Sequence, residues 1–301
     1  MKRLIVIGGP TASGKTDLAI QLAKHYQTEI VSADSRQCYR EMNIGVAKPS
    51  SEELASVKHH FINSHSIHEE VSAGKYEKYA LDILTDLFKI HDVVICVGGT
   101  GLYIKALCEG IDEMPSIDEQ IKQQVNNHYE KFGLSWLQEE VKKSDPLLFA
   151  NIDQQNPHRL QRGLVFFQST GQSITRYQQQ ITKSRPFDIL QFNIELDRPI
   201  LYQRIEDRVD TMIQAGLEEE AQSLLPFQQL KNLKTVGYQE FFDFFNGQIT
   251  RDEAILKIKQ HTRNYAKRQI TWFNHQSNFI EIQPHSSFEN VIETITNVEN
   301  K

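Results

Sequence analysis

Short apolar runs separated by helix-like repeats organise the sequence. Residues 4–7, 29–32, 93–97 and 189–194 are rich in β-branched and other apolar side chains, the composition of strands buried within a sheet. Between the second and third runs, apolar residues recur three or four positions apart over residues 73–88, which predicts a helix of about four turns. Alternation of strand, loop and helix is typical of a parallel sheet covered by helices. The pattern therefore predicts an α/β fold.

The pattern changes between residues 112 and 185, where no run has the apolar character of a core strand. A first helix is indicated by an apolar stripe that begins at Ile117, a second lies around residues 136–141, and Asn156-Pro157 is typical of the start of a third. We therefore expect a core made of residues 1–111 and 186–301, interrupted by a helical insertion at 112–185. The core is expected to continue in helices near residues 201–213, 217–225, 236–246 and 251–273.

A glycine loop follows the first predicted strand directly and precedes a predicted helix. Its eight residues satisfy G-x-x-x-x-G-K-[ST]: Gly9, Pro10, Thr11, Ala12, Ser13, Gly14, Lys15 and Thr16. The glycines let backbone N–H groups converge on one anion, and the helix N-terminus adds its positive end. Lys15 is expected to reach the outer phosphate, and the Thr16 hydroxyl is placed for Mg²⁺. The sequence thus predicts a P-loop core that binds a di- or triphosphate.

Composition and charge limit the class of protein. The chain of 301 residues is 39% hydrophobic and 24% charged, which is ordinary for a globular protein. No apolar run reaches the roughly 18 residues that cross a bilayer, and the first strand leaves no room for a cleavable signal, so we expect a cytoplasmic protein with no membrane partner. Three scattered cysteines offer no zinc framework. The net charge of −6 argues against binding nucleic acid through bulk positive charge, although a local basic groove is compatible with it.

Two polar residues that follow predicted strands are candidates for chemistry. Asp34 can serve as a general base or a metal ligand, or it can cap a helix N-terminus. Thr100 follows two glycines and can bind a phosphate or leaving group, or cap the next helix. Many P-loop enzymes hold Mg²⁺ with an aspartate at the end of an apolar strand, but the run at 93–97 is followed by two glycines. The metal would then be held by Asp34, or by Thr16 with phosphate and water.

Arginines recur at helical spacing in two places. Arg159 and Arg162 are three apart on the helix that Asn156 is expected to cap, and Arg204 and Arg208 are four apart on a later helix. Such pairs can grip phosphates, and a solvated helix face is the alternative. The helix predicted at 251–273 also carries an excess of positive charge.

Taken together, the motifs resemble those of the tRNA dimethylallyltransferase (isopentenyl-pyrophosphate transferase) family. The resemblance rests on motifs in the family's order over most of the chain, at residues 9–16, 32–37, 42–49, 97–103, 156–162, 236–238 and 266–272. It implies transfer of a dimethylallyl group from dimethylallyl diphosphate to the N6 amine of the adenosine immediately 3′ of the anticodon in tRNA. It also implies that the phosphate loop binds the isoprenoid's diphosphate rather than ATP. We expect Mg²⁺ as the cofactor, and a monomer.

The resemblance also implies roles for individual residues. Asp34 would be the catalytic base, with Thr100 near the transferred group and Lys15 assisting, while the eight loop residues and Arg208 would bind the diphosphate. The inserted helices would clamp the anticodon stem-loop. The residues expected to contact tRNA are Asp34, Ser35, Arg36, Gln37, Thr100, Lys122, His158, Arg159, Leu160, Gln161 and Arg162.

Two other classes of protein share parts of this pattern. A small-molecule or nucleotide kinase has the same P-loop core, but the missing strand-end aspartate and the long helical insertion count against it. A non-catalytic RNA-binding module would use the same basic helices without turnover.

Overall fold

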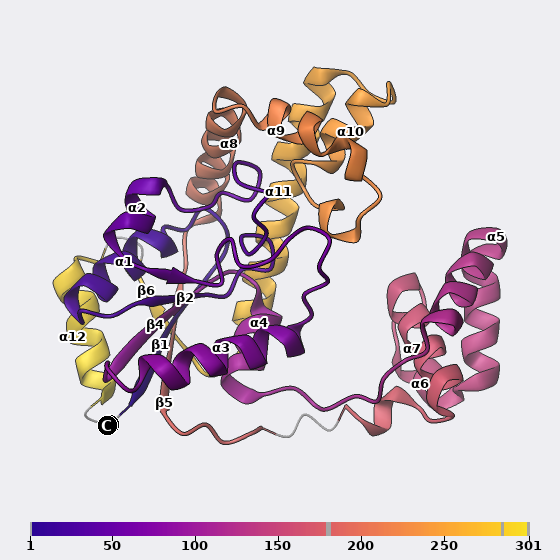
Figure 1. Ribbon diagram of the computed structural model, residues 1–301, viewed down its shortest axis with the longest axis horizontal. Coiled ribbons are helices and arrows are strands. Elements are labelled where there is room, and N and C mark those ends of the chain that lie inside the picture. The colour runs from indigo at the N-terminus through magenta and orange to yellow at the C-terminus, as the bar shows by residue number, and fades with distance from the viewer. Residues whose placement is uncertain (1, 179–181, 284–285, 300–301) are drawn as a thin grey trace. The chain divides into compact units, whose positions relative to one another are not determined.

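The computed structural model describes residues 2–178, 182–283 and 286–299 of the chain (Figure 1). A parallel sheet forms the centre of the larger part, and its described strands lie in the order β3-β2-β4-β1-β5-β6. Their bounds are β1 Arg3–Gly8, β2 Ile30–Ser32, β3 His59–His60, β4 Val93–Val97, β5 Asp188–Ile194 and β6 Phe279–Ile282. The predicted P-loop-like parallel sheet is therefore confirmed. The sequence pattern did not reveal the two outermost strands, β3 and β6.

Helices cover both faces of this sheet (Figure 1). Alternate residues of β1 point to opposite faces, as a strand requires. Leu4 and Val6 pack in a core with α3 and α4, whereas Ile5 and Ile7 pack in another with α1 and α12. The helices of this part are α1 Lys15–His25, α2 Ser51–Ser56, α3 Ala73–Leu87, α4 Gly101–Glu109, α8 Arg198–Gln214, α9 Leu217–Leu224, α10 Gln239–Phe245, α11 Arg251–Asn274 and α12 Phe288–Glu299.

The chain divides into two compact units, one of residues 1–109 and 184–301 and one of residues 110–183. The second unit contains α5 Glu119–Ser144, α6 Pro146–Asn151 and α7 Pro157–Thr170 around an apolar core of its own. Asp118 caps α5, and Gly133, at a φ of 74°, interrupts it. The interruption separates the two helices that the sequence pattern predicted there. The short helix α6 was not predicted.

The register of the sheet gathers the loops that follow β1, β2 and β4. Val97 pairs with Ile7 on one side and with Ser32 on the other, so the three strands end at one edge. The Thr100 N–H donates to the Ala33 carbonyl at 3.2 Å, which joins the loops after β4 and β2. A Cβ on Gly98 would lie 2.2 Å from the Ala33 oxygen, so this approach requires glycine. Ligand sites in parallel α/β sheets form at such an edge.

Among the described helices, none has the length and apolar character needed to cross a lipid bilayer.

Candidate functional site

The loop between β1 and α1 has the backbone form of an anion cradle. Gly9 and Gly14 have φ values of 140° and 90°, and Ala12 has a φ of 65°. Positive φ values within a short loop turn successive N–H groups toward one side, where they can surround a phosphate. Gly14 immediately precedes α1, so the positive end of this helix faces the same space.

Two cations converge on this loop. The buried Lys15 ammonium donates to the Pro10 carbonyl at 2.5 Å, and the Arg208 guanidinium donates to the Thr11 hydroxyl at 3.4 Å. Burial, followed by repulsion from Arg208, lowers the pKa of Lys15 to about 7, although Asp34 opposes the shift. Burial likewise lowers the pKa of Arg208. A bound anion would relieve this repulsion, so the electrostatics favour a phosphate-bearing ligand.

Asp34 lies in the loop after β2 and stabilises the turn that follows it. Its Oδ1 accepts hydrogen bonds from the backbone N–H groups of Arg36 at 2.8 Å and Gln37 at 3.2 Å. The capping role that sequence left open is therefore present, but it serves a turn rather than a helix. Within the described part of the chain both of these hydrogen bonds use Oδ1, so Oδ2 is available for chemistry.

The Thr100 hydroxyl binds this turn instead of capping the helix that begins at Gly101. Its Oγ1 accepts a hydrogen bond from the Ser35 N–H at 3.0 Å and donates to the Ser35 hydroxyl at 3.3 Å. Thr100 is thus held beside the turn that Asp34 begins. The loops after β2 and β4 form one continuous wall of the site.

Helix α11 connects these loops to the phosphate loop. The buried Gln269 side chain accepts a hydrogen bond from the Thr11 N–H at 2.8 Å and donates to the Gly99 carbonyl at 2.9 Å. One turn earlier, Tyr265 lies beside Thr100 and Asp34: burial and the Asp34 charge raise its pKa to about 12, while a hydrogen bond to Thr100 opposes the rise. Sequence reasoning missed both residues. The only signal was that Gln269 lies within a family motif.

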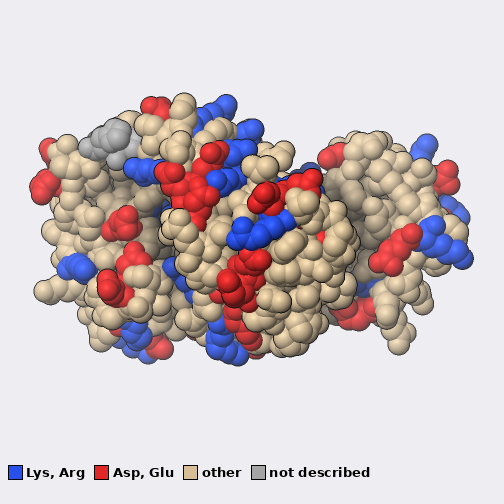
Figure 2. Space-filling view, turned by 90° about the horizontal axis from the view of Figure 1, so that it is seen from above, with Lys and Arg blue, Asp and Glu red and all other residues tan. Residues whose placement is uncertain are grey.

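Two cations of the predicted positive face of α11 form ion pairs with α8. Lys259 forms an ion pair with Asp210 at 2.6 Å, and Arg263 forms one with Glu206 at 2.5 Å. Positive and negative side chains are accordingly interspersed on the face shown in Figure 2. Helix α8 therefore offsets the local positive charge of this sequence segment at Lys259 and Arg263.

Comparison with known proteins identifies the family. The sequence profile described as IPP transferase matches residues 37–276. The chain is 47% identical over 270 residues to the tRNA dimethylallyltransferase of Christiangramia forsetii, covering 90% of this chain and 89% of that relative.

The chain belongs to the IPP transferase family.

Solved structures agree with this assignment. The full-length tRNA isopentenylpyrophosphate transferase of Bacillus halodurans superposes with a TM-score of 0.73 at 32% identity, covering 100% of this chain and 96% of that one. A eukaryotic dimethylallyltransferase acting on tRNA gives a TM-score of 0.77 at 23% identity, with coverage of 99% and 80%, and supports the fold alone. The resemblance inferred from the motifs is therefore confirmed at the level of the family.

Three of the residues that the family resemblance assigns to tRNA follow Asp34 directly. Two of them, Ser35 and Arg36, line a hollow of about 290 Å³ together with Thr100. The Arg36 guanidinium donates to the Asn232 carbonyl at 3.2 Å, and the Gln37 side chain donates to the Ala47 carbonyl at 2.9 Å. The hollow thus lies at the turn whose residues are expected to contact tRNA.

The other expected tRNA residues lie in the helical unit of residues 110–183. His158, Arg159 and Arg162 are exposed on α7, whose first turn is capped by the Asn156 side chain. The Leu160 side chain is fully buried in the core of this unit, and the expected contact of this residue with tRNA stays a prediction.

The two remaining residues have partners within the same unit. The Gln161 amide donates to the Asn126 side chain at 3.3 Å. The Lys122 ammonium lies 3.0 Å from the Glu119 carboxylate. An RNA phosphate would have to compete with Glu119 for Lys122.

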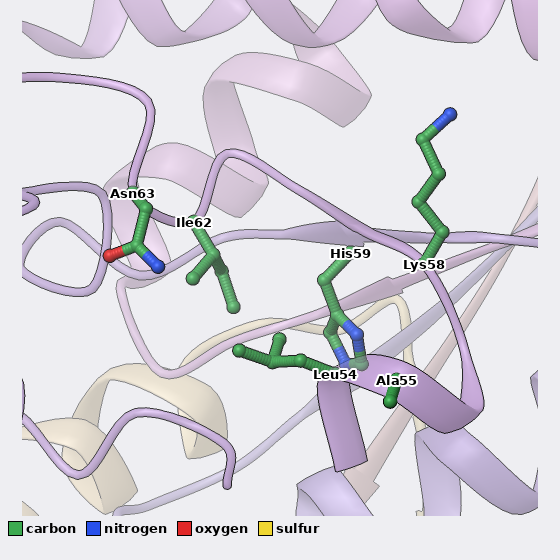
Figure 3. Close-up of a pocket in the computed structure, with 6 residues that line it drawn as sticks. All are labelled: Leu54, Ala55, Lys58, His59, Ile62 and Asn63. Carbon is green, nitrogen blue, oxygen red and sulfur yellow. The ribbon is translucent and has the colours of Figure 1, made fainter. Parts of the chain in front are cut away.

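A second hollow, of about 300 Å³, lies between α2 and the loop that follows β3 (Figure 3). Leu54, Ala55 and Ile62 supply apolar walls, and His59 also lines the hollow. The His59 Nδ1 contacts the Val57 carbonyl at 2.8 Å, and burial lowers the pKa of this imidazole. None of its lining residues belongs to the expected site, so this hollow plays no part in the proposal below.

Proposed function

We propose that this chain transfers the dimethylallyl group of dimethylallyl diphosphate to the N6 amine of the adenosine immediately 3′ of the anticodon in tRNA. The proposal rests mainly on Gln269, whose side chain forms hydrogen bonds to both halves of the site. One half is the phosphate loop with its two cations, and the other is the Asp34–Thr100 wall. A diphosphate and an acceptor that must lose a proton suit these two halves.

In the proposed reaction, the adenine nitrogen attacks the allylic carbon while the bond from that carbon to the diphosphate oxygen breaks. An exocyclic amine conjugated to a purine is a poor nucleophile, so a carboxylate that accepts its proton assists the step. Asp34 supplies this carboxylate through Oδ2 while Oδ1 holds the turn. Thr100 lies beside it and bounds the space for the transferred group.

The diphosphate gains negative charge as it leaves. The backbone N–H groups of residues 12–16, with Lys15 and Arg208, would surround its proposed binding position. Groups that bind a developing charge more strongly than the ground state accelerate the reaction. Burial lowers the pKa of Lys15, and a bound anion would raise it again. Lys15 would therefore be positively charged when the diphosphate leaves.

Mg²⁺ fits the oxygen donors of this site. Mg²⁺ commonly binds one or two protein oxygens together with substrate phosphates and water. Thr16, in the first turn of α1, would hold it alongside the diphosphate and water, and Asp34 would be a ligand only if its Oδ2 did not serve as the base. When bound, the ion would neutralise charge on the leaving diphosphate.

We propose that the tRNA anticodon stem-loop is the macromolecular substrate and that the helical unit clamps it. Exposed His158, Arg159 and Arg162 on α7 are suited to phosphate and base contacts. The target base must leave the stack to react, and a single-stranded loop allows this at low energetic cost. That the protein works as a monomer in the cytoplasm stays a prediction.

A labelling experiment tests the proposal. Purified protein is incubated with radiolabelled dimethylallyl diphosphate, Mg²⁺ and unmodified tRNA, and a matched tRNA carries guanosine in place of the target adenosine. We expect label in the first tRNA and none in the second. Equal labelling of both would contradict the proposed target. ATP consumption with a nucleoside acceptor would instead indicate a kinase, and tRNA binding without transfer would indicate a binding module.

A further inference from the structure

A single carboxylate, that of Glu220 on α9, organises the loop of residues 43–48. Its Oε2 accepts hydrogen bonds from the N–H groups of Asn43 at 3.0 Å and Ile44 at 2.9 Å. Its Oε1 accepts one from the Gly45 N–H at 3.0 Å and one from the Tyr238 hydroxyl at 2.6 Å. Four donors converging on one side chain define the conformation of three successive residues of this loop.

Two further contacts fix the loop from its other sides. The Tyr238 ring packs so closely that a Cβ on Gly45 would lie 2.6 Å from it, so no other residue fits there. The Lys48 ammonium donates to the Tyr39 carbonyl and to the Asn63 side chain, both at 2.5 Å. The loop therefore has one conformation held by α9, by the segment before α10 and by its own lysine.

This loop in turn sets the direction of the Gln37 amide. Gln37 Nε2 donates to the Ala47 carbonyl at 2.9 Å and to the Val46 carbonyl at 3.3 Å. Carbonyl oxygens only accept hydrogen bonds, so these partners require the nitrogen, not the oxygen, of the amide at this position. Both carbonyls therefore bind the amide nitrogen. Within the described residues Oε1 has no hydrogen-bond partner and can accept one from RNA.

We infer that Glu220 is a positioning residue for tRNA recognition, which acts by fixing the loop of residues 43–48 and through it the orientation of the Gln37 amide. The inference rests on the proposed function because it requires Gln37 to contact the substrate tRNA. Glu220 itself would touch neither substrate.

The test uses Glu220→Gln, which has nearly the same shape as the native side chain. A glutamine offers one accepting oxygen, so at least one of the three backbone N–H groups faces an NH₂ group instead. We expect the KM for tRNA to rise by roughly three- to tenfold, on the scale of one partly buried donor left unsatisfied. The KM for dimethylallyl diphosphate and the kcat at saturating tRNA should stay within about twofold of the native values, because no group of the transfer site changes.

Two variants serve as comparisons. Glu218→Gln changes a glutamate of the same helix that binds Arg251 and not the loop, so it should leave the KM for tRNA unchanged. Tyr238→Phe removes one donor to Glu220 and leaves the three backbone donors in place, so it should raise this KM in the same direction by a smaller factor. If Glu220→Gln does not fold, Tyr238→Phe still provides the test.

A double-mutant cycle with Gln37→Ala decides whether Glu220 acts through Gln37. If it does, Glu220→Gln should add little to the KM for tRNA once Gln37 is alanine. Full additivity, or an unchanged KM for tRNA in both Glu220→Gln and Tyr238→Phe, would overturn the inference. An unchanged KM for Gln37→Ala alone would do the same. None of these results would contradict the proposed function. That proposal fails only if the native protein does not transfer the dimethylallyl group to tRNA.

Discussion

Lys15 is a buried cation that lies close to a second cation. Its pKa of about 7 means that a large share of the ligand-free protein carries a neutral amine at neutral pH. A bound diphosphate favours the charged form and raises this pKa. Binding is therefore coupled to proton uptake whenever the pH lies between the free and the bound pKa values.

This coupling predicts the pH dependence of donor binding. Below about pH 7 Lys15 is already protonated, and above it each binding event must take up a proton, so affinity should fall as the pH rises, by at most about tenfold per pH unit. Isothermal titration calorimetry with dimethylallyl diphosphate between about pH 6 and about pH 9 would measure the slope.

Lys15→Met provides the control for that titration because the diphosphate itself also ionises. The variant should bind more weakly at low pH and show only the ligand's own pH dependence. If the native protein and Lys15→Met had parallel curves, the Lys15 ammonium would not be the group that takes up the proton.

Asp34 has two separable roles, and two variants distinguish them. Asn keeps an oxygen that can accept from the Arg36 and Gln37 N–H groups, so Asp34→Asn should retain tRNA affinity while kcat falls by roughly 10²–10⁴-fold. Asp34→Ala removes the accepting oxygen too, so both kcat and tRNA affinity should fall. Filter binding and single-turnover transfer measure the two quantities. A native kcat in Asp34→Asn would rule out its role as the base.

At the residue scale, the sequence indicated the phosphate loop and Asp34 because local spacing encodes them. The loop motif is contiguous, and Asp34 follows a recognisable strand. Gln269 and Tyr265 could not be found this way, because their partners are far away in sequence: Gln269 binds Thr11 and Gly99. Motif membership also does not tell which side chains pack, since Leu160 lies inside a motif and is fully buried.

At the element scale, α11 holds two loops of the site together through the hydrogen bonds of Gln269. Its sequence suggested a basic surface helix, yet α8 supplies acidic partners for Lys259 and Arg263. Tight packing holds its far end as well, since a Cβ on Gly101 would lie 2.2 Å from the Trp272 ring. The periodicity of the sequence predicts where a helix lies. Which element packs against each face of that helix depends on the tertiary fold.

Replacing Gln269 tests whether α11 holds these two loops together. Gln269→Leu has a similar volume but cannot bind the Thr11 N–H or the Gly99 carbonyl. Leaving these buried groups without a partner should lower the free energy of unfolding by about 1–3 kcal/mol and raise the KM for dimethylallyl diphosphate. Urea unfolding and steady-state kinetics check the two effects.

Thr271→Ala, at an exposed position of the same helix, is the matched control for Gln269→Leu. It should leave both quantities near their native values. A Gln269→Leu protein with native stability and a native KM for the donor would show that α11 does not hold the two loops together.

At the scale of the whole molecule, strand order explains why the site lies where it does. β1 is central, with β4 and β5 as its neighbours, and β2 lies next to β4. The loops that carry Lys15, Asp34 and Thr100 therefore leave one edge of the sheet. The alternation of strands and helices predicted this class of fold, but β3, with two residues, and β6, at the outside of the sheet, were too weak to recognise.

The account depends on the phosphate loop holding a prenyl diphosphate opposite Asp34. A crystal structure with a thio analogue of dimethylallyl diphosphate, which cannot transfer its group, tests this most directly. We predict the diphosphate within hydrogen-bond distance of the backbone N–H groups of residues 12–16 and of Lys15, with the allylic carbon toward Asp34 and Thr100. An analogue bound elsewhere, together with ATP in the loop and phosphate transfer from it, would contradict the account.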